Sequence, residues 1–258
     1  TGGNLVVTDV NGTTADNLTI TLNGANIRVS DSTNAIYAGP GATQIDANKT
    51  FALFYPEKRE FFLENSGVFA LGESYRFTAS GGRPTETLFF HSRRIGLTPT
   101  TGQPIPMLGG ARLTGRIGQY YVGLLNLQTM SEQNIPANNF TVARLRRNLF
   151  ANSDVGFIFL NRQSRLPNDH NRTYGADVSL YLLRQYLKIN GVVGKTETPT
   201  RTGEDWYRKV EGVWDDGFFR AIGSYLDVQK NFNPEVGFVR RAGSRIFHNE
   251  VGLRFFQT

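Results

Sequence analysis

Residues 173–195 read TYGADVSLYLLRQYLKINGVVGK, and two alternating runs in this stretch decide the fold class. From Tyr174 to Leu182 apolar side chains occupy every second position, and a similar run begins at Leu187 after a tight turn. A side-chain period of two is typical of a β-strand. Each run is roughly ten residues long, which matches the 9–11 residues of a tilted strand that crosses a bilayer. A long hairpin in a soluble sandwich fits these two runs equally well.

The composition favours strands and turns over a helical bundle, with 19 Phe and 28 Gly residues. The sequence has no run of about 18 apolar residues, so no transmembrane helix is expected. A mean hydropathy of -0.32 agrees with a membrane barrel, because half of each strand would face a polar interior. The absence of cysteine excludes disulfides, thiolate metal sites and cysteine nucleophiles. The net charge is +6, but no basic run indicates a nucleic-acid partner.

The connections between the predicted strands alternate in length. Nine strands are predicted after residue 107, at 108–117, 120–129, 140–149, 154–162, 174–183, 186–195, 206–214, 218–227 and 244–256. Short turns alternate with long polar loops, which include 131–139, 162–172 and 196–205. This rhythm is typical of outer-membrane barrels and has no cause in a soluble sandwich. We therefore predict an all-β fold, an antiparallel up-and-down β-barrel of the outer-membrane type or part of one, preceded by a short β-rich segment.

The charged residues of these strands fall mostly on one face. Charges on a lipid face cost about 2–4 kcal/mol near the bilayer midplane, so they should point into the lumen. The predicted lumen-facing residues are Arg112, Arg116, Arg144, Arg146, Asp177, Lys188, Lys209, Glu211, Arg220, Glu250 and Arg254. Their unmatched positive charge would attract anions if the barrel is open. Alternatively, opposite charges on neighbouring strands pair and simply brace a narrow barrel.

Residues 1–50 differ from the rest of the chain, being rich in Asn, Thr, Asp, Gly and Ala. Asn23-Gly24 between two alternating runs predicts a hairpin. This composition resembles the β-rich repeats of bacterial surface proteins, and that resemblance implies an adhesive or structural role. We expect two parts, a β-rich segment at 1–50 and an outer-membrane-type barrel region at 51–258.

Several segments after residue 50 resemble a family of uncharacterised bacterial outer-membrane barrel proteins. They are FALFYPEKREFFLENSG (51–67), LFFHSRRIGL (88–97), PMLGGARLTGRIG (106–118), GLLNLQT (123–129), NFTVARLRRNL (139–149), NRTYGADVSL (171–180) and SYLDVQKNFNPEVGFVRR (224–241). Members commonly carry a carbohydrate-binding domain of the family-nine type before the barrel. The resemblance implies a place in the bacterial outer membrane or at the cell surface, with outer-membrane lipid as partner and glycans or anionic solutes as candidate ligands.

No catalytic, cofactor-binding or metal-binding residues are predicted, and we expect no enzyme and no cofactor. Two acidic groups of residues have an alternative interpretation as acid/base or catalytic sites: Glu57, Glu60 and Glu64 in a charged turn, and the loop pair Asp169-His170. Arg59 and Lys58 would neutralise the first group, and an Asn-rich loop tip explains the second. The three histidines, His91, His170 and His248, lack the spacing of metal ligands.

Three functions follow in order of preference. The first is an outer-membrane barrel for passage or docking of glycan-related or anionic solutes. The second is an adhesive or structural surface protein, and the third is an enzyme inside a barrel.

Nine is an odd number of strands, whereas single-chain bacterial barrels normally have an even number. Further strands are therefore expected from 51–107, from a missing companion part or from a partner chain.

Overall fold

The computed structural model describes residues 18–23, 26–31, 57–64, 66–72, 87–98, 103–132, 135–150 and 152–254. The chain divides into two compact units, Thr1–Ala52 and Leu53–Thr258, close to the predicted change near Thr50. In the first unit, β1 (Leu18–Asn23) pairs antiparallel with β2 (Asn26–Asp31). This hairpin encloses the predicted Asn23-Gly24 turn.

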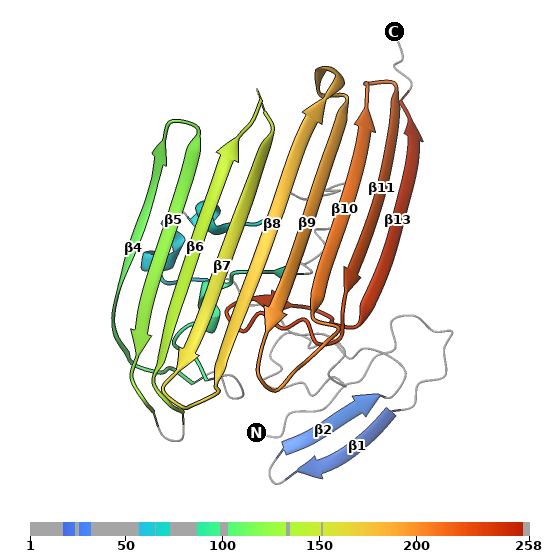
Figure 1. The fold of residues 1–258 in the computed structure, drawn as a ribbon. Coiled ribbons are helices and arrows are strands. Elements are labelled where there is room, and N and C mark those ends of the chain that lie inside the picture. Colours follow the sequence, from blue (N-terminus) through green and yellow to red (C-terminus); the bar gives the residue numbers. More distant parts are fainter. Residues whose placement is uncertain are drawn as a thin grey trace. The chain divides into compact units, whose positions relative to one another are not determined.

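The second unit is built on one antiparallel sheet of nine strands, each paired with its neighbour in the sequence (Figure 1). The strands are β4 (Met107–Ile117), β5 (Tyr120–Thr129), β6 (Asn138–Asn148), β7 (Asp154–Ser164), β8 (His170–Leu182), β9 (Leu187–Glu197), β10 (Trp206–Asp215), β11 (Phe219–Val228) and β13 (Ser244–Leu253). This architecture confirms the predicted all-β, up-and-down fold and the nine predicted strands after residue 107.

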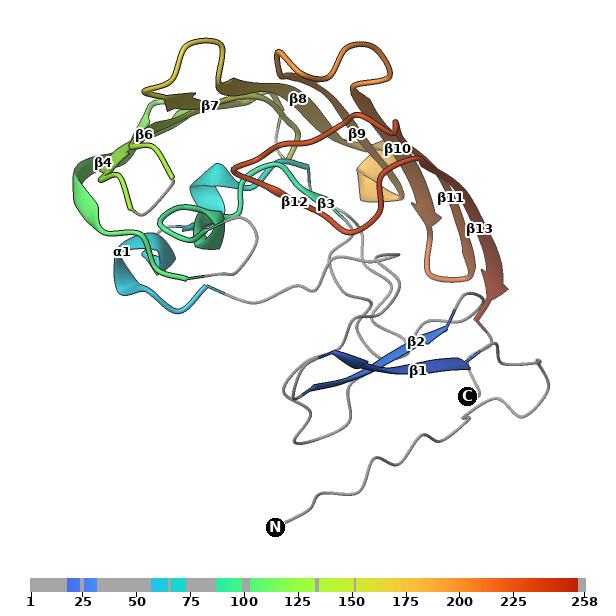
Figure 2. The same ribbon diagram turned by 90° about the horizontal axis from the view of Figure 1, so that it is seen from below.

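The sheet is strongly curved but not closed (Figure 2). Strands β4 and β13 form its two edges. Neighbouring strands are antiparallel throughout, so in a sheet of nine the two edge strands run in the same direction. An antiparallel barrel can therefore close only if an odd number of further strands is inserted between β13 and β4. The open sheet therefore agrees with the second of the two predicted forms, part of a barrel.

The connections fall into two groups at opposite ends of the sheet. At one end, here the turn end, are residues 118–119, 149–153, 183–186 and 216–218. At the other, the loop end, are residues 130–137, 165–169, 198–205 and 229–243. The predicted loop at 162–172 is wrong in its bounds, because β7 continues to Ser164 and β8 begins at His170. The strand ends there are polar on both faces, and the fully buried Asn171 side chain bonds to Thr198 and the Asn233 carbonyl.

The concave side of the sheet holds a further layer of chain (Figure 2). We name residues 57–72 and 87–98 the inner segment. It contains α1 (Glu60–Leu63), the 3-10 helices Ser66–Phe69 and Ser92–Arg94, and β3 (Thr87–Leu88), which pairs with β12 (Phe238–Val239). Every helix among the described residues is too short or too polar to cross a lipid bilayer.

Aromatic side chains of the inner segment form the core with the concave face of the sheet. The Phe89 ring lies 5.2 Å from the ring of Tyr207 and 5.4 Å from that of Phe232. A Cβ added at Gly194 would overlap the Phe89 ring. Because glycine has no side chain, Gly194 leaves space for the Phe89 ring to pack against strand β9.

We predict that Gly194→Ala lowers the free energy of unfolding by about 1–3 kcal/mol, because the added methyl overpacks against Phe89. Gly212→Ala is the matched control, since a Cβ there meets no atom within 4 Å. Urea unfolding of both variants in detergent measures the difference. If Gly194→Ala is as stable as Gly212→Ala, the Phe89 ring does not pack against Gly194.

Candidate functional site

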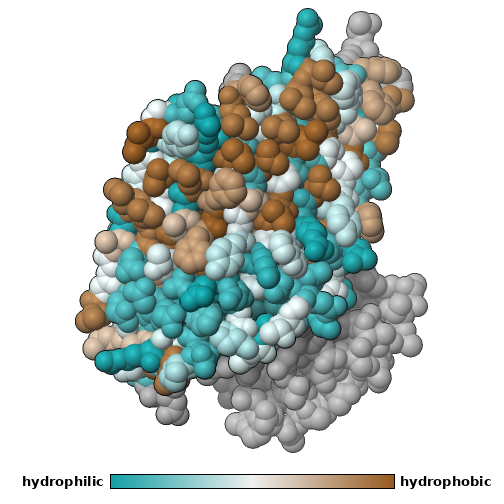
Figure 3. Space-filling model, in the orientation of Figure 1, coloured by the Kyte–Doolittle hydropathy of each residue, from teal (hydrophilic) through white to brown (hydrophobic). Residues whose placement is uncertain are grey.

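The convex face of the sheet, here the outer face, is apolar over its turn half. Figure 3 shows this band across the upper part of the face seen in Figure 1. Many of its side chains are exposed, including Phe157 at 58% and Val251 at 70%. From strand to strand the band includes Leu113, Leu124, Leu145, Phe157, Val178, Ile189, Val210, Ala221 and Val251. Arg147 and Asn249 are the two polar interruptions in this half of β6 and β13.

The same face is polar over its loop half. On β5 and β6, the Asn126 amide donates to Asn139 (3.0 Å) and Thr141 (2.8 Å), and Asn139 donates to Gln128 (3.2 Å). The outer-face residues farther along the sheet are Asn161, Gln163, Arg172, Glu197, Arg208, Asp227 and Arg245. The outer face therefore changes from apolar to polar along β5 to β8, and on β9, β10, β11 and β13 it becomes polar only toward the loop end.

The boundary between these two halves crosses the strands obliquely. On β5 it falls between Leu124 and Asn126. Residues paired across neighbouring strands form a row perpendicular to the strands. The row that is apolar at Val122 on β5 is polar where it crosses β10 and β11, at Arg208 and Asp227. Barrel strands are tilted by about 35–45° to the barrel axis, so a plane across a barrel cuts the paired rows in this stepwise manner. The boundary thus follows a plane rather than a row.

Aromatic side chains with polar groups mark both borders of the apolar band. At the loop-side border, the Tyr174 hydroxyl donates to Glu197 (3.5 Å), and Lys195 and Arg208 lie over the Trp206 ring. At the turn-side border, the Trp214 indole donates to Asp216 (3.1 Å). The polar ends of Tyr174 and Trp214 therefore point out of the band in opposite directions.

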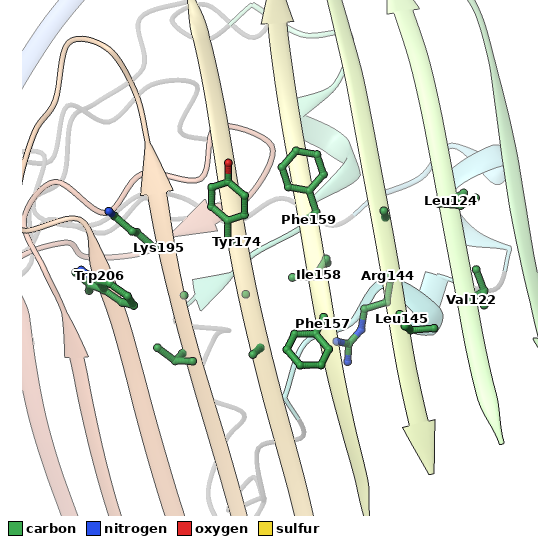
Figure 4. Close-up of a pocket in the computed structure, with 15 residues that line it drawn as sticks. Val122, Leu124, Arg144, Leu145, Phe157, Ile158, Phe159, Tyr174, Lys195 and Trp206 are labelled. Atoms are coloured by element: carbon green, nitrogen blue, oxygen red, sulfur yellow. The ribbon is translucent and has the colours of Figure 1, made fainter. Parts of the chain in front are cut away.

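A shallow hollow of about 720 Å³ lies within the apolar band between β5 and β10 (Figure 4). Phe157, Phe159 and Tyr174 project into it from neighbouring strands, and Lys195 and Trp206 lie together at one end. Its lining offers few polar groups, whereas a binding site for a polar small molecule needs several that converge. The chemistry of this hollow suits apolar chains.

The concave, inner face shows the reverse pattern. In its loop half the apolar buried side chains pack on the inner segment, as Leu125, Val142, Ile158, Leu160 and Val228 do. Buried polar residues lie among them at the loop end, and these are Thr129, Asn138, Ser164, Asn171, Thr173 and Thr196. In its turn half the side chains are mostly polar, with Val192, Val213 and Ile222 as exceptions. The two faces of the sheet thus change polarity in opposite directions along the strands.

The strand register places every predicted lumen-facing residue on this inner face. The eleven are Arg112, Arg116, Arg144, Arg146, Asp177, Lys188, Lys209, Glu211, Arg220, Glu250 and Arg254, the last just beyond the end of β13. Whether this face lines an open passage stays a prediction. Phe255, predicted as part of the last strand, lies outside the described residues.

The buried ion pair between Arg144 and Asp177 lies where the two halves of the inner face meet. The two terminal guanidinium nitrogens of Arg144, Nη1 and Nη2, donate to the Asp177 carboxylate, at 2.6 and 2.9 Å. The backbone N–H of Gly72 donates to the same carboxylate at 2.9 Å, which ties the inner segment to β8. A Cβ at Gly156 would overlap this pair, so the glycine provides its space.

The inner face has less unmatched positive charge than the predicted lumen-facing residues suggest, because acidic residues outside that set pair with its arginines. Arg112 pairs with Glu64 of the inner segment, at 2.6 Å. Arg254 and Arg220 share Asp215, which lies on the inner face at the end of β10 rather than in the turn. Much of the inner charge is therefore paired, as the alternative interpretation of a braced wall expects.

The predicted charged turn at residues 57–60 organises the inner segment. Arg59 donates to Glu57 and to the carbonyls of Ser92 and Ile95, and its guanidinium lies 4.3 Å from the Phe62 ring centre. Burial alone would raise the pKa of Glu57, but hydrogen bonds from Arg59 and Ser92 and the charge of Arg59 outweigh it and lower the pKa from 4.5 to about 2. Glu57 is thus held as a carboxylate, and Glu64 is engaged with Arg112.

No group of three or more His, Cys, Asp or Glu side chains among the described residues could hold a metal ion. Asp169 of the predicted Asp169-His170 pair accepts a hydrogen bond from Arg162 at 2.6 Å. That bond, with the charge of Arg162, lowers the pKa of Asp169.

Comparison of the chain with protein-family models, curated proteins and solved structures gave no match. The resemblance to the outer-membrane barrel family therefore stays a prediction.

Asp177→Ala should lower the free energy of unfolding by about 3–5 kcal/mol, because it leaves Arg144 buried without a counter-ion. Lys230→Ala is the control, since it breaks the exposed Lys230–Glu204 pair and should cost about 0–1 kcal/mol. Urea titration in detergent compares the two. Equal losses would mean that the Arg144 side chain reaches solvent.

Glu57→Gln should destabilise the protein at neutral pH and have little effect at low pH. A carboxylate with a lowered folded-state pKa stabilises the fold above its unfolded value of 4.5, and this contribution is lost as the pH falls toward 2. The urea midpoints of wild type and variant should therefore converge between pH 4.5 and 2. Glu60→Gln, at an exposed position, should follow wild type, and a constant difference across this range would contradict the assignment.

Proposed function

We propose that the sheet formed by β4 to β13 is part of the wall of a bacterial outer-membrane β-barrel. Its turn half would lie in the hydrocarbon of the bilayer and its loop half would project into water. The observation that carries this proposal is the opposite change of polarity along the two faces of the sheet. A wall that passes from lipid into water needs an apolar outer face only where lipid surrounds it.

The exposure of the apolar band supports this interpretation over a soluble sandwich. Soluble monomers rarely leave contiguous apolar patches larger than about 300–600 Å² exposed. The band crosses all nine strands and includes large, exposed side chains such as Leu113, Phe157 and Val251. A soluble protein would cover such a surface, whereas lipid chains solvate it.

The height of the band also approaches that of the apolar band of an outer-membrane barrel. On β8 the apolar outer-face positions run from Tyr174 to Leu182, and Arg172 follows on the loop side. At about 3.3 Å per residue, this stretch is about 26 Å long, and a strand tilt of about 35–45° reduces it to a height of about 18–21 Å along the barrel axis. Outer-membrane barrels have an apolar band about 25 Å high with aromatic residues at both borders. Trp206 and Trp214 would occupy those two borders.

The role that we propose for the barrel is docking of glycan-related or anionic solutes rather than their free passage. Short turns of such barrels normally lie on the periplasmic side and long loops outside. The inner segment and its aromatic core fill the loop half of the concave face, which disfavours a wide channel along this part of the wall. Outer-membrane lipid would be the partner of the apolar band.

Phe157→Arg should weaken insertion into lipid by about 2–4 kcal/mol, because Phe157 would lie well inside the hydrocarbon. Asn161→Arg is the matched control, on the same strand and face but in the polar half, and should cost about 0–1 kcal/mol. Equilibrium folding into phospholipid vesicles, followed by heat-modifiable gel migration, measures both. A soluble protein would give the opposite result: Phe157→Arg would be neutral, and wild type would not partition into vesicles.

A further inference from the structure

We propose that Arg116, Tyr121 and Arg146 form a binding site for an oxyanion, a phosphate or carboxylate group, on the inner face at the turn end. This inference deepens the docking role proposed above and rests on it for the origin of the ligand. It concerns only the first three strands of the sheet, β4, β5 and β6.

The strand register brings the three side chains together. Arg116 on β4 pairs with Tyr121 on β5, and Tyr121 pairs with Arg146 on β6, so the three form one row across the sheet. The guanidinium carbon of Arg116 lies 5.1 Å from the centre of the Tyr121 ring, and that of Arg146 lies 4.7 Å from it. Cation–π contacts of this length hold both cations beside one aromatic ring.

These two arginines differ from their neighbours on the inner face in their partners. Arg144 donates two hydrogen bonds to the Asp177 carboxylate, and Arg112 donates to the Glu64 carboxylate and to the Phe61 and Glu64 carbonyls. Within the described residues, Arg116 donates only to the carbonyl of Gly118 in the adjacent turn, and Arg146 contacts the Tyr121 ring without an ion pair. Two positive charges therefore share one ring, and most of their hydrogen-bond donors remain available.

The surroundings leave the site accessible from the turn end. Arg116 is exposed, and Tyr121 and Arg146 are half-buried. On the loop side the inner segment closes the space: a Cβ at Gly123 would overlap Phe69, and Arg112 is held by the Phe61 and Glu64 carbonyls. The site thus lies between the filled part of the concave face and the turn end of the sheet.

The chemistry of the donors identifies the class of ligand. A guanidinium presents a planar fork of N–H donors that matches the two oxygens of a carboxylate or phosphate. Two adjacent cations also repel each other, and an anion between them relieves that repulsion. The two guanidinium groups would contact only the anionic group of the ligand. A phosphate ester and an acidic sugar therefore both carry the group that this site recognises.

The test is isothermal titration of the full chain in detergent with inorganic phosphate and, separately, with glucuronate at low ionic strength. The two probes distinguish a phosphate site from a carboxylate site. Arg146→Gln and Arg116→Gln should each weaken the better probe about tenfold or more, because each removes a charge-assisted hydrogen bond of about 1.5–3 kcal/mol. Binding should also weaken as salt is added.

Arg147→Gln is the matched control, because Arg147 lies one residue away on the outer face and makes the equivalent ring contact, at 5.4 Å with Tyr120. It should leave affinity within about twofold of wild type if only the inner-face charges contribute. Equal loss in Arg147→Gln and Arg146→Gln, or no binding of either probe to wild type, overturns the inference. Arg146→Lys, which keeps the charge without the fork, serves if Arg146→Gln does not fold, and should also weaken binding.

These outcomes are separate from those that test the proposed function. Titration in detergent needs a folded chain but no bilayer. Vesicle insertion without anion binding would reject the site and leave the barrel proposal intact. Anion binding without vesicle insertion would reject the barrel proposal and leave the site.

Discussion

Alternate side chains of a β-strand point to opposite faces, and the structure depends on how each face changes polarity along the strand. If one face is apolar along a whole strand, it needs a single cover from one end to the other. Here the outer face is apolar in the turn half, and most of the buried apolar side chains of the inner face lie in its loop half. The two halves therefore need different surroundings. The inner segment covers the loop half, and we propose that lipid covers the turn half.

The inner face joins these halves through a small number of fitted contacts. Gly194 leaves space for the Phe89 ring, and Gly156 leaves space for the Arg144–Asp177 pair. The pair lies at the change of polarity, where Asp177 also accepts a hydrogen bond from Gly72. A charge buried at this depth is tolerated because bidentate pairing and the backbone donor replace its hydration. The same contacts fix the inner segment against the wall.

The strands were predictable from the sequence because their pattern is local. Alternation such as that from Tyr174 to Leu182 fixes both the element and the side to which Asp177 points. The inner segment was not predictable as a filling of the concave face, since its contacts join residues far apart in the chain, such as Arg59 with Ile95 or Phe89 with Tyr207. The counter-ions Glu64 and Asp215 were missed for the same reason. Asn171 was misread as a loop residue because its burial depends on the distant Asn233 carbonyl.

The arginines of the inner face show the same limit. Their common side of the sheet follows from alternation, but only the register across β4, β5 and β6 distinguishes Arg146, on the Tyr121 ring, from Arg144, in its ion pair. In sequence these two residues are two positions apart and chemically identical. Their environments differ because Arg144 is buried in its ion pair beside the inner segment, whereas Arg146 is only half-buried.

The central claim is that lipid surrounds only the turn half, and solvent accessibility along one strand tests it most directly. The chain has no cysteine, so nitroxide labels can be placed singly at the outer-face positions of β8, from Arg172 to Leu182, in protein reconstituted into phospholipid vesicles. The account predicts high accessibility to oxygen and low accessibility to a water-soluble nickel complex from 176 to 180. It predicts the reverse at 172. High nickel accessibility along the whole strand would contradict it.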